Sequence, residues 1–157
     1  MDISVIMVTY NRRDILRRTL LLYNEQTEMA GRFEIVLVDD GSTDGTLDMI
    51  ETLRPGLAYP LQVLVLSAND GPAKSRNEAI DAARGDLLCL TCDDILPGPG
   101  LLHQHWTWHA ERPDDSVAVL GHIAWHPELN PTPLMKWLES SGDQFAYGDL
   151  RHGDARA

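Results

Sequence analysis

The chain has 157 residues, and 24 acidic residues against 13 Lys and Arg give it a formal net charge of −11. This length suits one domain with a substantial core. The acidic balance argues against binding of nucleic-acid phosphates and is compatible with carboxylates that bind a cation. No apolar run approaches the roughly 18 residues that span a bilayer, and the N-terminus lacks the basic segment of a signal peptide, so we expect a cytoplasmic protein.

Five strand-like runs alternate with helical patterns. The strands are expected at residues 3–8, 34–38, 61–66, 86–90 and 116–120. The helices are expected after Asn11, which can cap the first, then from about Leu47, from Pro72 to about Gly85, from about Pro99 to Glu111, and over residues 134–138. This order predicts an α/β fold, a mostly parallel sheet flanked by helices. We expect a domain at residues 1–126, followed by a partial segment at 127–157.

The second predicted strand has the most informative end. Its apolar run from Ile35 to Val38 is typical of a strand covered on both faces, and it stops at Asp39 and Asp40. Polar residues follow the other strands too. They are Thr9, Tyr10 and Asn11 after the first, Ser67, Asn69 and Asp70 after the third, and Asp93 and Asp94 after the fourth.

Parallel strands end along one edge of a sheet, where open α/β folds bind their ligands. Two pairs of adjacent acids on that edge would repel unless a cation or donors compensate them, which favours a binding site over turn chemistry. Lys74 and Arg76 stand near the start of the third helix. Cations at a helix N-terminus beside carboxylates suit a phosphorylated ligand with a bridging divalent metal.

Several motifs, taken together and in order, resemble family 2 glycosyltransferases, which are inverting enzymes of the Rossmann-like GT-A fold. The motifs are ISVIMVTYN at 3–11, VDDGSTDGT at 38–46, GPAKSRN at 71–77, ARGD at 83–86 and the acidic end of the fourth strand. The resemblance covers about residues 1–126. It implies a domain that binds a nucleoside-diphosphate sugar, linked to UDP, GDP or dTDP, together with Mn²⁺ or Mg²⁺.

The resemblance also implies roles for individual residues. Tyr10 would stack on the base, Asp39 and Asp40 would hold the base and ribose, and Arg76 would lie near the diphosphate. The further candidates for nucleotide-sugar binding are Thr9, Asn11, Asn69 and Lys74.

Asp93 and Asp94 stand at the metal-binding D-x-D motif of the family. Many members read Asp-x-Asp-Asp, whereas this chain reads Thr91-Cys-Asp-Asp94 and lacks the first acid. A Thr-x-Asp-Asp form occurs in some members. One or two carboxylates can hold a divalent cation when substrate phosphates and water complete its coordination.

The implied reaction is a single displacement, in which an acceptor hydroxyl attacks the anomeric carbon with help from a general base. In this family the base comes later in the chain, with the acceptor-binding half, and Asp143, Asp149 and Asp154 are not convincing candidates. The catalytic residues and the acceptor therefore stay unassigned. We expect mainly the donor-binding part of a glycosyltransferase, or alternatively a non-catalytic nucleotide-sugar-binding module. A missing half could expose apolar surface, with homodimerisation as one consequence.

Other hypotheses rank lower. Residues 40–51 fit the spacing of an EF-hand calcium loop, but a strand pattern precedes them where a helix is needed. A nucleotidyltransferase would have a glycine-rich basic loop after the first strand, where residues 9–13 contain no glycine. Cys89 and Cys92 are spaced as half a zinc site or a redox pair, but no second pair exists, so we interpret them as small residues at a strand end.

Overall fold

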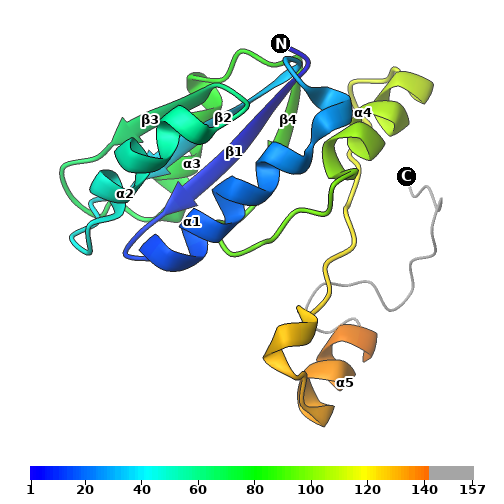
Figure 1. The fold of residues 1–157 in the computed structure, drawn as a ribbon. Helices are drawn as coiled ribbons and strands as arrows, with labels where there is room; N and C mark the ends of the chain where they lie inside the picture. The colour runs from blue at the N-terminus through cyan, green and yellow to red at the C-terminus, as the bar shows by residue number, and fades with distance from the viewer. Residues whose placement is uncertain (142–157) are drawn as a thin grey trace. The chain divides into compact units, whose positions relative to one another are not determined.

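The computed structural model describes residues 1–141, and the chain divides into two compact units, Met1–Val119 and Leu120–Ala157. The first unit contains one parallel sheet with the strand order β3-β2-β1-β4 (Figure 1). Its strands are β1 (Ile3–Thr9), β2 (Phe33–Asp39), β3 (Leu61–Val65) and β4 (Leu87–Leu90). The predicted α/β fold with a mostly parallel sheet is confirmed.

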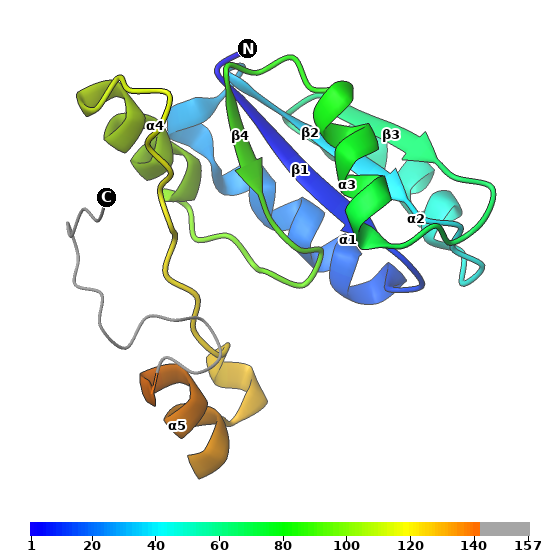
Figure 2. The ribbon, with the colours of Figure 1, turned by 180° about the vertical axis from the view of Figure 1, so that it is seen from behind.

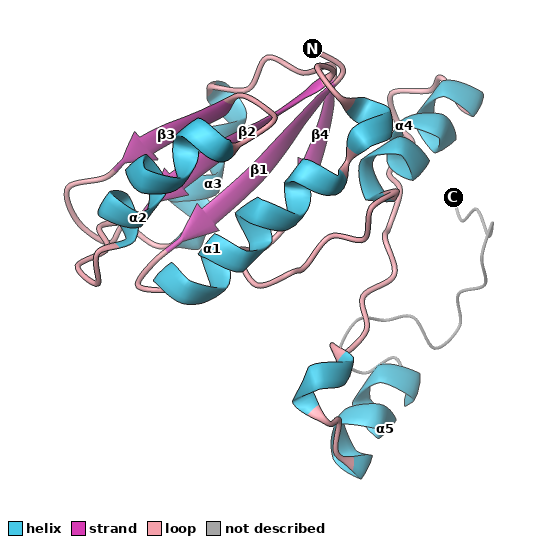
Figure 3. Cartoon of the chain, viewed as in Figure 1, coloured by secondary structure: helices cyan, strands magenta, loops and turns pink. Residues whose placement is uncertain are grey.

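Helices cover both faces of this sheet. They are α1 (Arg13–Leu22), α2 (Thr46–Leu53), α3 (Pro72–Asp81) and α4 (Leu101–Glu111). Short 3-10 turns lie at Tyr23–Glu25, Thr27–Met29 and Arg54–Gly56. Helices α1 and α2 lie side by side on one face (Figure 3), and α3 lies on the other face, as the view from behind shows (Figure 2).

The core follows from the alternation of side chains along the strands. Ile35 and Leu37 of β2 pack on the α1 and α2 side, whereas Val36 and Val38 pack on the α3 side. Both sets are fully buried, so this strand is apolar on both faces, as its continuous apolar run predicts. The parallel register brings Thr9 beside Asp39 at the carboxyl edge.

Two predictions about elements are wrong. Residues 116–120 form no strand, because Ser116 and Val117 donate their amides to the side chain and carbonyl of Asp114 in a turn. Asn11 does not cap α1, since it has a left-handed φ of 53° and its side chain accepts from another loop. The amide of Arg13, the first residue of α1, donates instead to Asp44 Oδ2 at 3.0 Å.

A buried carboxylate joins the strands at the opposite, amino edge of the sheet. Glu34 in β2 is fully buried, and it accepts hydrogen bonds from the Ser4 hydroxyl at 2.8 Å and from the Arg84 amide at 2.9 Å. The Arg84 guanidinium pairs with its other oxygen. Burial alone raises the pKa of Glu34, but the bonds from Arg84 and Ser4 outweigh it, and the net pKa lies below the ordinary value.

This linkage gives a pH-dependent stability. A carboxylate with a lowered folded-state pKa stabilises fully above its unfolded pKa of about 4.3 and loses that contribution as the pH falls through the folded value. We expect Glu34→Gln to melt about 5 °C below the parent at pH 7, with the gap closing below about pH 4. Thermal melts from pH 7 to pH 3 measure this. Glu51→Gln, at an exposed glutamate, should show no such convergence; a gap for Glu34→Gln that is constant with pH would contradict the prediction.

The second unit is described as far as Ser141. It contains a 3-10 turn at Pro127–Leu129 and helix α5 (Pro133–Ser141), which confirms the short helix expected at residues 134–138. The Trp125 indole donates to the Met135 carbonyl at 2.9 Å, and the Trp125 amide donates to Glu139 at 3.0 Å. Within residues 1–141, no helix combines the length and apolar character needed to cross a membrane. Asp143, Asp149 and Asp154 lie outside the described residues.

Candidate functional site

The carboxyl ends of the four strands share one edge of the sheet, as predicted (Figure 1). Hydrogen bonds fix Asp93 at this edge. The Thr9 hydroxyl at the end of β1 donates to Asp93 Oδ2 at 2.7 Å, and the Thr19 hydroxyl of α1 donates to the Asp93 carbonyl at 2.7 Å. Only 4% of Asp93 is exposed. Burial raises its pKa, against the lowering effects of Thr9 and Arg12. The hydrogen bonds from Thr9 and Thr19 anchor the loop after β4 to β1 and α1.

Asp39, at the end of β2, is fully buried beside Thr9. Its Oδ1 accepts a hydrogen bond from the Ser42 amide at 3.3 Å, but its Oδ2 has no hydrogen-bond partner in the described part of the chain. A buried carboxylate oxygen without a donor is costly, and buried polar atoms are normally paired. This atom is therefore an open acceptor at the carboxyl edge of the sheet.

The Asp40 side chain binds the loop before α3, on the opposite face of the sheet from the side chain of Asp39. Its two carboxylate oxygens accept from the amides of Asp70 and Gly71 at 3.0 and 3.1 Å, in the loop before α3. Neighbouring side chains of a strand point to opposite faces. The adjacent acids are thus separated, and backbone donors compensate the charge of Asp40, so the repulsion expected from sequence is relieved without a cation.

The loops after β1 and β2 are tied to each other through Asn11. The Asn11 amide donates to Ser42 Oγ at 2.9 Å, and the Thr43 amide donates to Asn11 Oδ1 at 2.8 Å. These bonds hold the strand-end loop that contains Tyr10, of which 45% is exposed. An aromatic ring that is this exposed and stands on an ordered loop can stack on a planar ligand.

The predicted cations near α3 differ from each other in their surroundings. Lys74 pairs with Asp70 at 2.5 Å across one helical turn, and this hydrogen bond raises the pKa of Lys74. Arg76 is half-buried and makes no ion pair with any residue from 1 to 141. Asn69 is exposed in the loop between β3 and α3. Arg76 is accordingly the better placed of the two cations to meet an anionic ligand.

Arg12 contacts the acids of the site, although no motif in the sequence selects it. Its Nη1 lies 2.5 Å from Asp94 Oδ2 and 3.4 Å from Asp93 Oδ1. These contacts join residues more than 80 positions apart in the sequence. The only local signal was a basic residue directly after the polar end of the first strand.

The donor set at Asp93 and Asp94 fits a divalent metal that a ligand helps to hold. Two neighbouring carboxylates offer the hard oxygen ligands that Mg²⁺ and Mn²⁺ prefer. Among the described residues, no three His, Cys, Asp or Glu side chains gather as a metal site. A cation here would therefore complete its coordination with water, or with phosphate oxygens when a nucleotide is bound.

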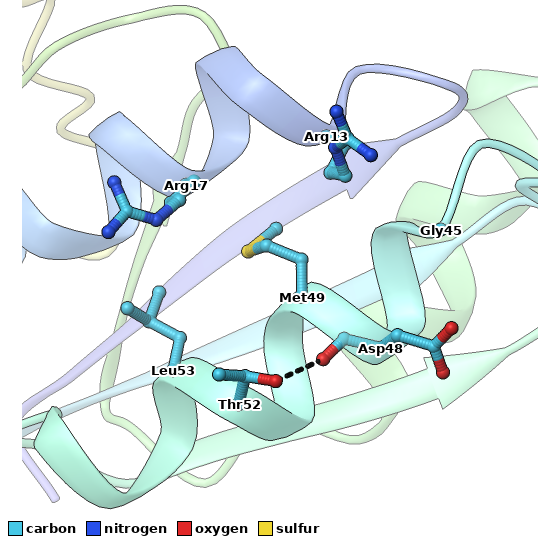
Figure 4. Close-up of a pocket in the computed structure, with 7 residues that line it drawn as sticks. All are labelled: Arg13, Arg17, Gly45, Asp48, Met49, Thr52 and Leu53. Atoms are coloured by element: carbon cyan, nitrogen blue, oxygen red, sulfur yellow. Dashed lines mark hydrogen bonds between the residues drawn. The ribbon is translucent and has the colours of Figure 1, made fainter.

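Two grooves lie near this edge. The larger, of about 500 Å³, runs between α1 and α2 and contains none of the predicted site residues. Figure 4 shows Arg13 and Arg17 facing Met49 and Leu53 across it. The smaller groove, of about 420 Å³, lies at the start of α1 and includes Asn11 and Arg12 among its walls. Of these two grooves, only the smaller reaches a predicted site residue, Asn11, together with Arg12, which contacts Asp93 and Asp94.

The competing motifs have structural explanations. In the EF-hand-like stretch, Asp40 binds backbone amides, Asp44 accepts from the Thr46 amide at 3.1 Å at the start of α2, and Glu51 pairs with Arg54. Their side chains bind different parts of the protein, and a strand precedes the loop. Cys89 and Cys92 are free thiols, and burial raises the pKa of Cys89 to about 11, which disfavours a reactive thiolate.

Comparison with known proteins identifies the family. The family model described as glycosyl transferase family 2 matches residues 4–153. The chain belongs to glycosyl transferase family 2. This membership confirms the resemblance seen in the sequence motifs and decides against the nucleotidyltransferase and EF-hand hypotheses.

Relatives within family 2 include two bacterial proteins. The uncharacterized glycosyltransferase YfnE of Bacillus subtilis is 36% identical over 121 residues, which are 77% of this chain and 30% of that protein. Validoxylamine A glucosyltransferase of Streptomyces hygroscopicus subsp. jinggangensis is 33% identical over 136 residues, which are 87% of this chain and 32% of the relative. The chain thus spans about a third of the length of these relatives.

Solved structures with the same fold include two nucleotide-sugar complexes. S. aureus TarS 1–349 in complex with UDP-GlcNAc has a TM-score of 0.67 at 28% identity, over 78% of this chain and 38% of that one. The mannosyltransferase PcManGT from Pyrobaculum calidifontis, in complex with GDP-Man and Mn²⁺, has a TM-score of 0.70 at 26% identity, over 78% and 35%. The fold of the present chain is therefore the GT-A fold of these glycosyltransferases.

Proposed function

We propose that the chain is the donor-binding part of an inverting glycosyltransferase that moves a sugar from a nucleoside diphosphate to an acceptor hydroxyl. The observation that supports this most is the unpartnered Oδ2 of buried Asp39 at the carboxyl edge of the sheet. An N–H group on the edge of a nucleobase would supply the donor that this oxygen lacks. Uracil, thymine and guanine each have a ring N–H, which agrees with a UDP, dTDP or GDP donor.

The remaining site residues suit the rest of the nucleotide. Tyr10 is exposed on the neighbouring loop and would stack on the base. Asp40 holds the loop before α3 and would form one side of the ribose site. Asn69, Lys74 and Arg76 lie on that loop and helix, where the diphosphate would meet positive charge. The acidic edge and these cations together match a ligand with both polar hydroxyls and phosphates.

Asp93 and Asp94 would hold Mn²⁺ or Mg²⁺ together with the donor phosphates. Such a cation supplies positive charge against the charge that develops on the leaving diphosphate. Thr9 and Thr19 contribute by fixing Asp93 through its side chain and its carbonyl. A preorganised site loses less energy to reorganisation when charge develops during the reaction.

The chemical step is a displacement at the anomeric carbon. A bond forms from the acceptor oxygen to this carbon while the bond to the β-phosphate oxygen breaks, and the configuration inverts. The acceptor proton passes to a general base that residues 1–141 do not identify, and the electron pair of the broken bond leaves with the nucleoside diphosphate. In this proposal the described residues would bind the donor. The acceptor hydroxyl, the cytoplasmic location and a homodimer stay predictions.

Substitution of Asp39 tests the proposal. Asp39→Asn keeps the size of the side chain and an acceptor for the Ser42 amide, but it removes the charge that faces the base. We expect calorimetric titration of UDP and GDP with Mn²⁺ to show a loss of affinity of about 10- to 100-fold for the nucleotide that the parent prefers. Asp48→Asn, an equal charge change on the exposed face of α2, should bind like the parent.

Two other outcomes are informative. Equal nucleotide binding by the parent and Asp39→Asn would contradict the assignment of Asp39 to the base. Binding that depends on Asp39, with no sugar transfer to any acceptor by a longer chain that includes the following region, would favour the alternative of a non-catalytic nucleotide-sugar-binding module.

A further inference from the structure

We infer that Arg12 is an internal counter-cation, which holds Asp93 and Asp94 when no metal is bound and turns to the diphosphate when one is. This inference rests on the proposed function, because it concerns the same site. It adds a competition between a protein cation and the metal, and it assigns a second role to the arginine in the nucleotide complex.

Arg12 already compensates the charge of both acids. Its Nη1 contacts Asp94 Oδ2 at 2.5 Å and Asp93 Oδ1 at 3.4 Å, and Thr9 donates to the remaining oxygen of Asp93. The two adjacent carboxylates, one of them buried, thus have a positive partner in the protein itself. This explains how the acidic pair is tolerated without a bound metal.

The contact with Arg12 occupies carboxylate oxygens that a metal would also use. A cation ligated by Asp94 Oδ2 at about 2.1 Å would lie within about 5 Å of the Arg12 nitrogen, where two positive charges repel. Binding of the cation to these acids therefore requires that Arg12 withdraw. The arginine can do so, because half of its side chain is exposed and the residue precedes the first turn of α1.

Arg12 has space beside it into which it can turn. While it contacts the acids, it already lines the groove of about 420 Å³ at the start of α1, beside Asn11 on the loop that also contains Tyr10. A diphosphate bound to a cation at Asp93 and Asp94 would bring negative charge next to that groove. Arginine binds phosphate oxygens in a two-pronged geometry, so its charge would be compensated there.

The two roles predict opposite effects of one substitution. Without nucleotide, Arg12→Ala should bind Mn²⁺ about three- to tenfold more tightly than the parent, because the competing ion pair is gone. At saturating Mn²⁺, the same variant should bind UDP or GDP about three- to tenfold more weakly, because a phosphate partner is gone. Electron paramagnetic resonance of free Mn²⁺ measures the first affinity, and calorimetry measures the second.

Arg17→Ala is the matched control, since it removes one positive charge from an exposed position on α1 away from the acids. It should behave like the parent in both titrations, and thermal melts should show that both variants are folded. The inference is overturned if Arg12→Ala binds Mn²⁺ no more tightly than the parent, or if its nucleotide affinity is unchanged while the parent binds both ligands. Failure of the parent to bind any nucleotide with Mn²⁺ would instead remove the proposed function, and this inference with it.

Discussion

Asp93→Asn should lower the affinity for UDP or GDP in the presence of Mn²⁺ by at least about a hundredfold. Loss of a residue that hydrogen-bonds to a metal ligand costs about 10- to 100-fold in metal affinity. Asp93 is itself proposed as a ligand, so its loss should cost more. Asparagine retains an oxygen that can accept the Thr9 hydrogen bond, so the loop after β4 should stay anchored. Calorimetric titration of nucleotide with Mn²⁺ measures the loss.

Two further variants distinguish the loss of the Asp93 charge from a general effect of removing a charge or a hydrogen bond. Asp81→Asn changes the charge equally on an exposed residue at the end of α3 and should bind nucleotide like the parent. Thr9→Val removes the donor to Asp93 without changing any acid, and it should weaken binding by a smaller factor of about ten. Parental nucleotide affinity in Asp93→Asn would rule out Asp93 as part of the metal and diphosphate site.

Gly85→Ala should destabilise the first unit by about 3 kcal/mol, the upper end of the range for overpacking. A Cβ atom at this position would lie 2.4 Å from the Ser4 nitrogen and 2.6 Å from the Ile3 carbonyl carbon. Both are backbone atoms of β1 and cannot rotate away. The clash would separate the start of β4 from β1, where Gly85 also donates its amide to the Ser4 hydroxyl at 2.8 Å.

Urea denaturation gives the free energy of unfolding for this comparison. Gly98→Ala is the control, because an added Cβ there meets no atom within 4 Å. It should unfold within about 0.5 kcal/mol of the parent. A stability of Gly85→Ala equal to that of Gly98→Ala would show that the ARGD segment does not pack against β1 as the structure has it.

The ARGD segment is thus explained by structure rather than by ligand binding. Arg84 and Gly85 lie at the amino edge of the sheet, where they contact Glu34 of β2 and Ser4 of β1. The strand-end acids lie at the opposite edge. Among the motifs typical of the family, ARGD therefore holds the strands together, whereas the acidic strand ends form the candidate site.

The sequence predicted the features that depend on local periodicity. The apolar run from Ile35 to Val38 predicts a strand buried on both faces, and Pro72 favours the start of a helix. Alternating strands and helices of this kind predict a parallel sheet, and with it the carboxyl edge at which the strands end. The ends of β1 and β2 at Thr9 and Asp39 lie on one edge because the strands are parallel, and hydrogen bonds from Thr9 and Thr19 hold Asp93, in the loop after β4, at the same edge.

Features that depend on long-range contacts could not be predicted in this way. The contact of Arg12 with Asp94 spans 82 positions, and no spacing rule links them. The strand expected at residues 116–120 does not form. A strand-like sequence shows a preference but does not supply a neighbouring strand, and the amides of Ser116 and Val117 donate to Asp114 in a turn instead. The separation of Asp39 from Asp40 follows from strand alternation, but the amides that satisfy Asp40 come from a loop 30 residues away.

A crystal structure of the chain with Mn²⁺ and the nucleotide diphosphate that it binds more tightly tests the central claim most directly. We expect a base N–H within hydrogen-bonding distance of Asp39 Oδ2, the ring of Tyr10 against the base, and the metal on Asp93 or Asp94. This expectation would be contradicted by a nucleotide bound elsewhere, such as in the groove between α1 and α2, with Asp39 Oδ2 still lacking a donor.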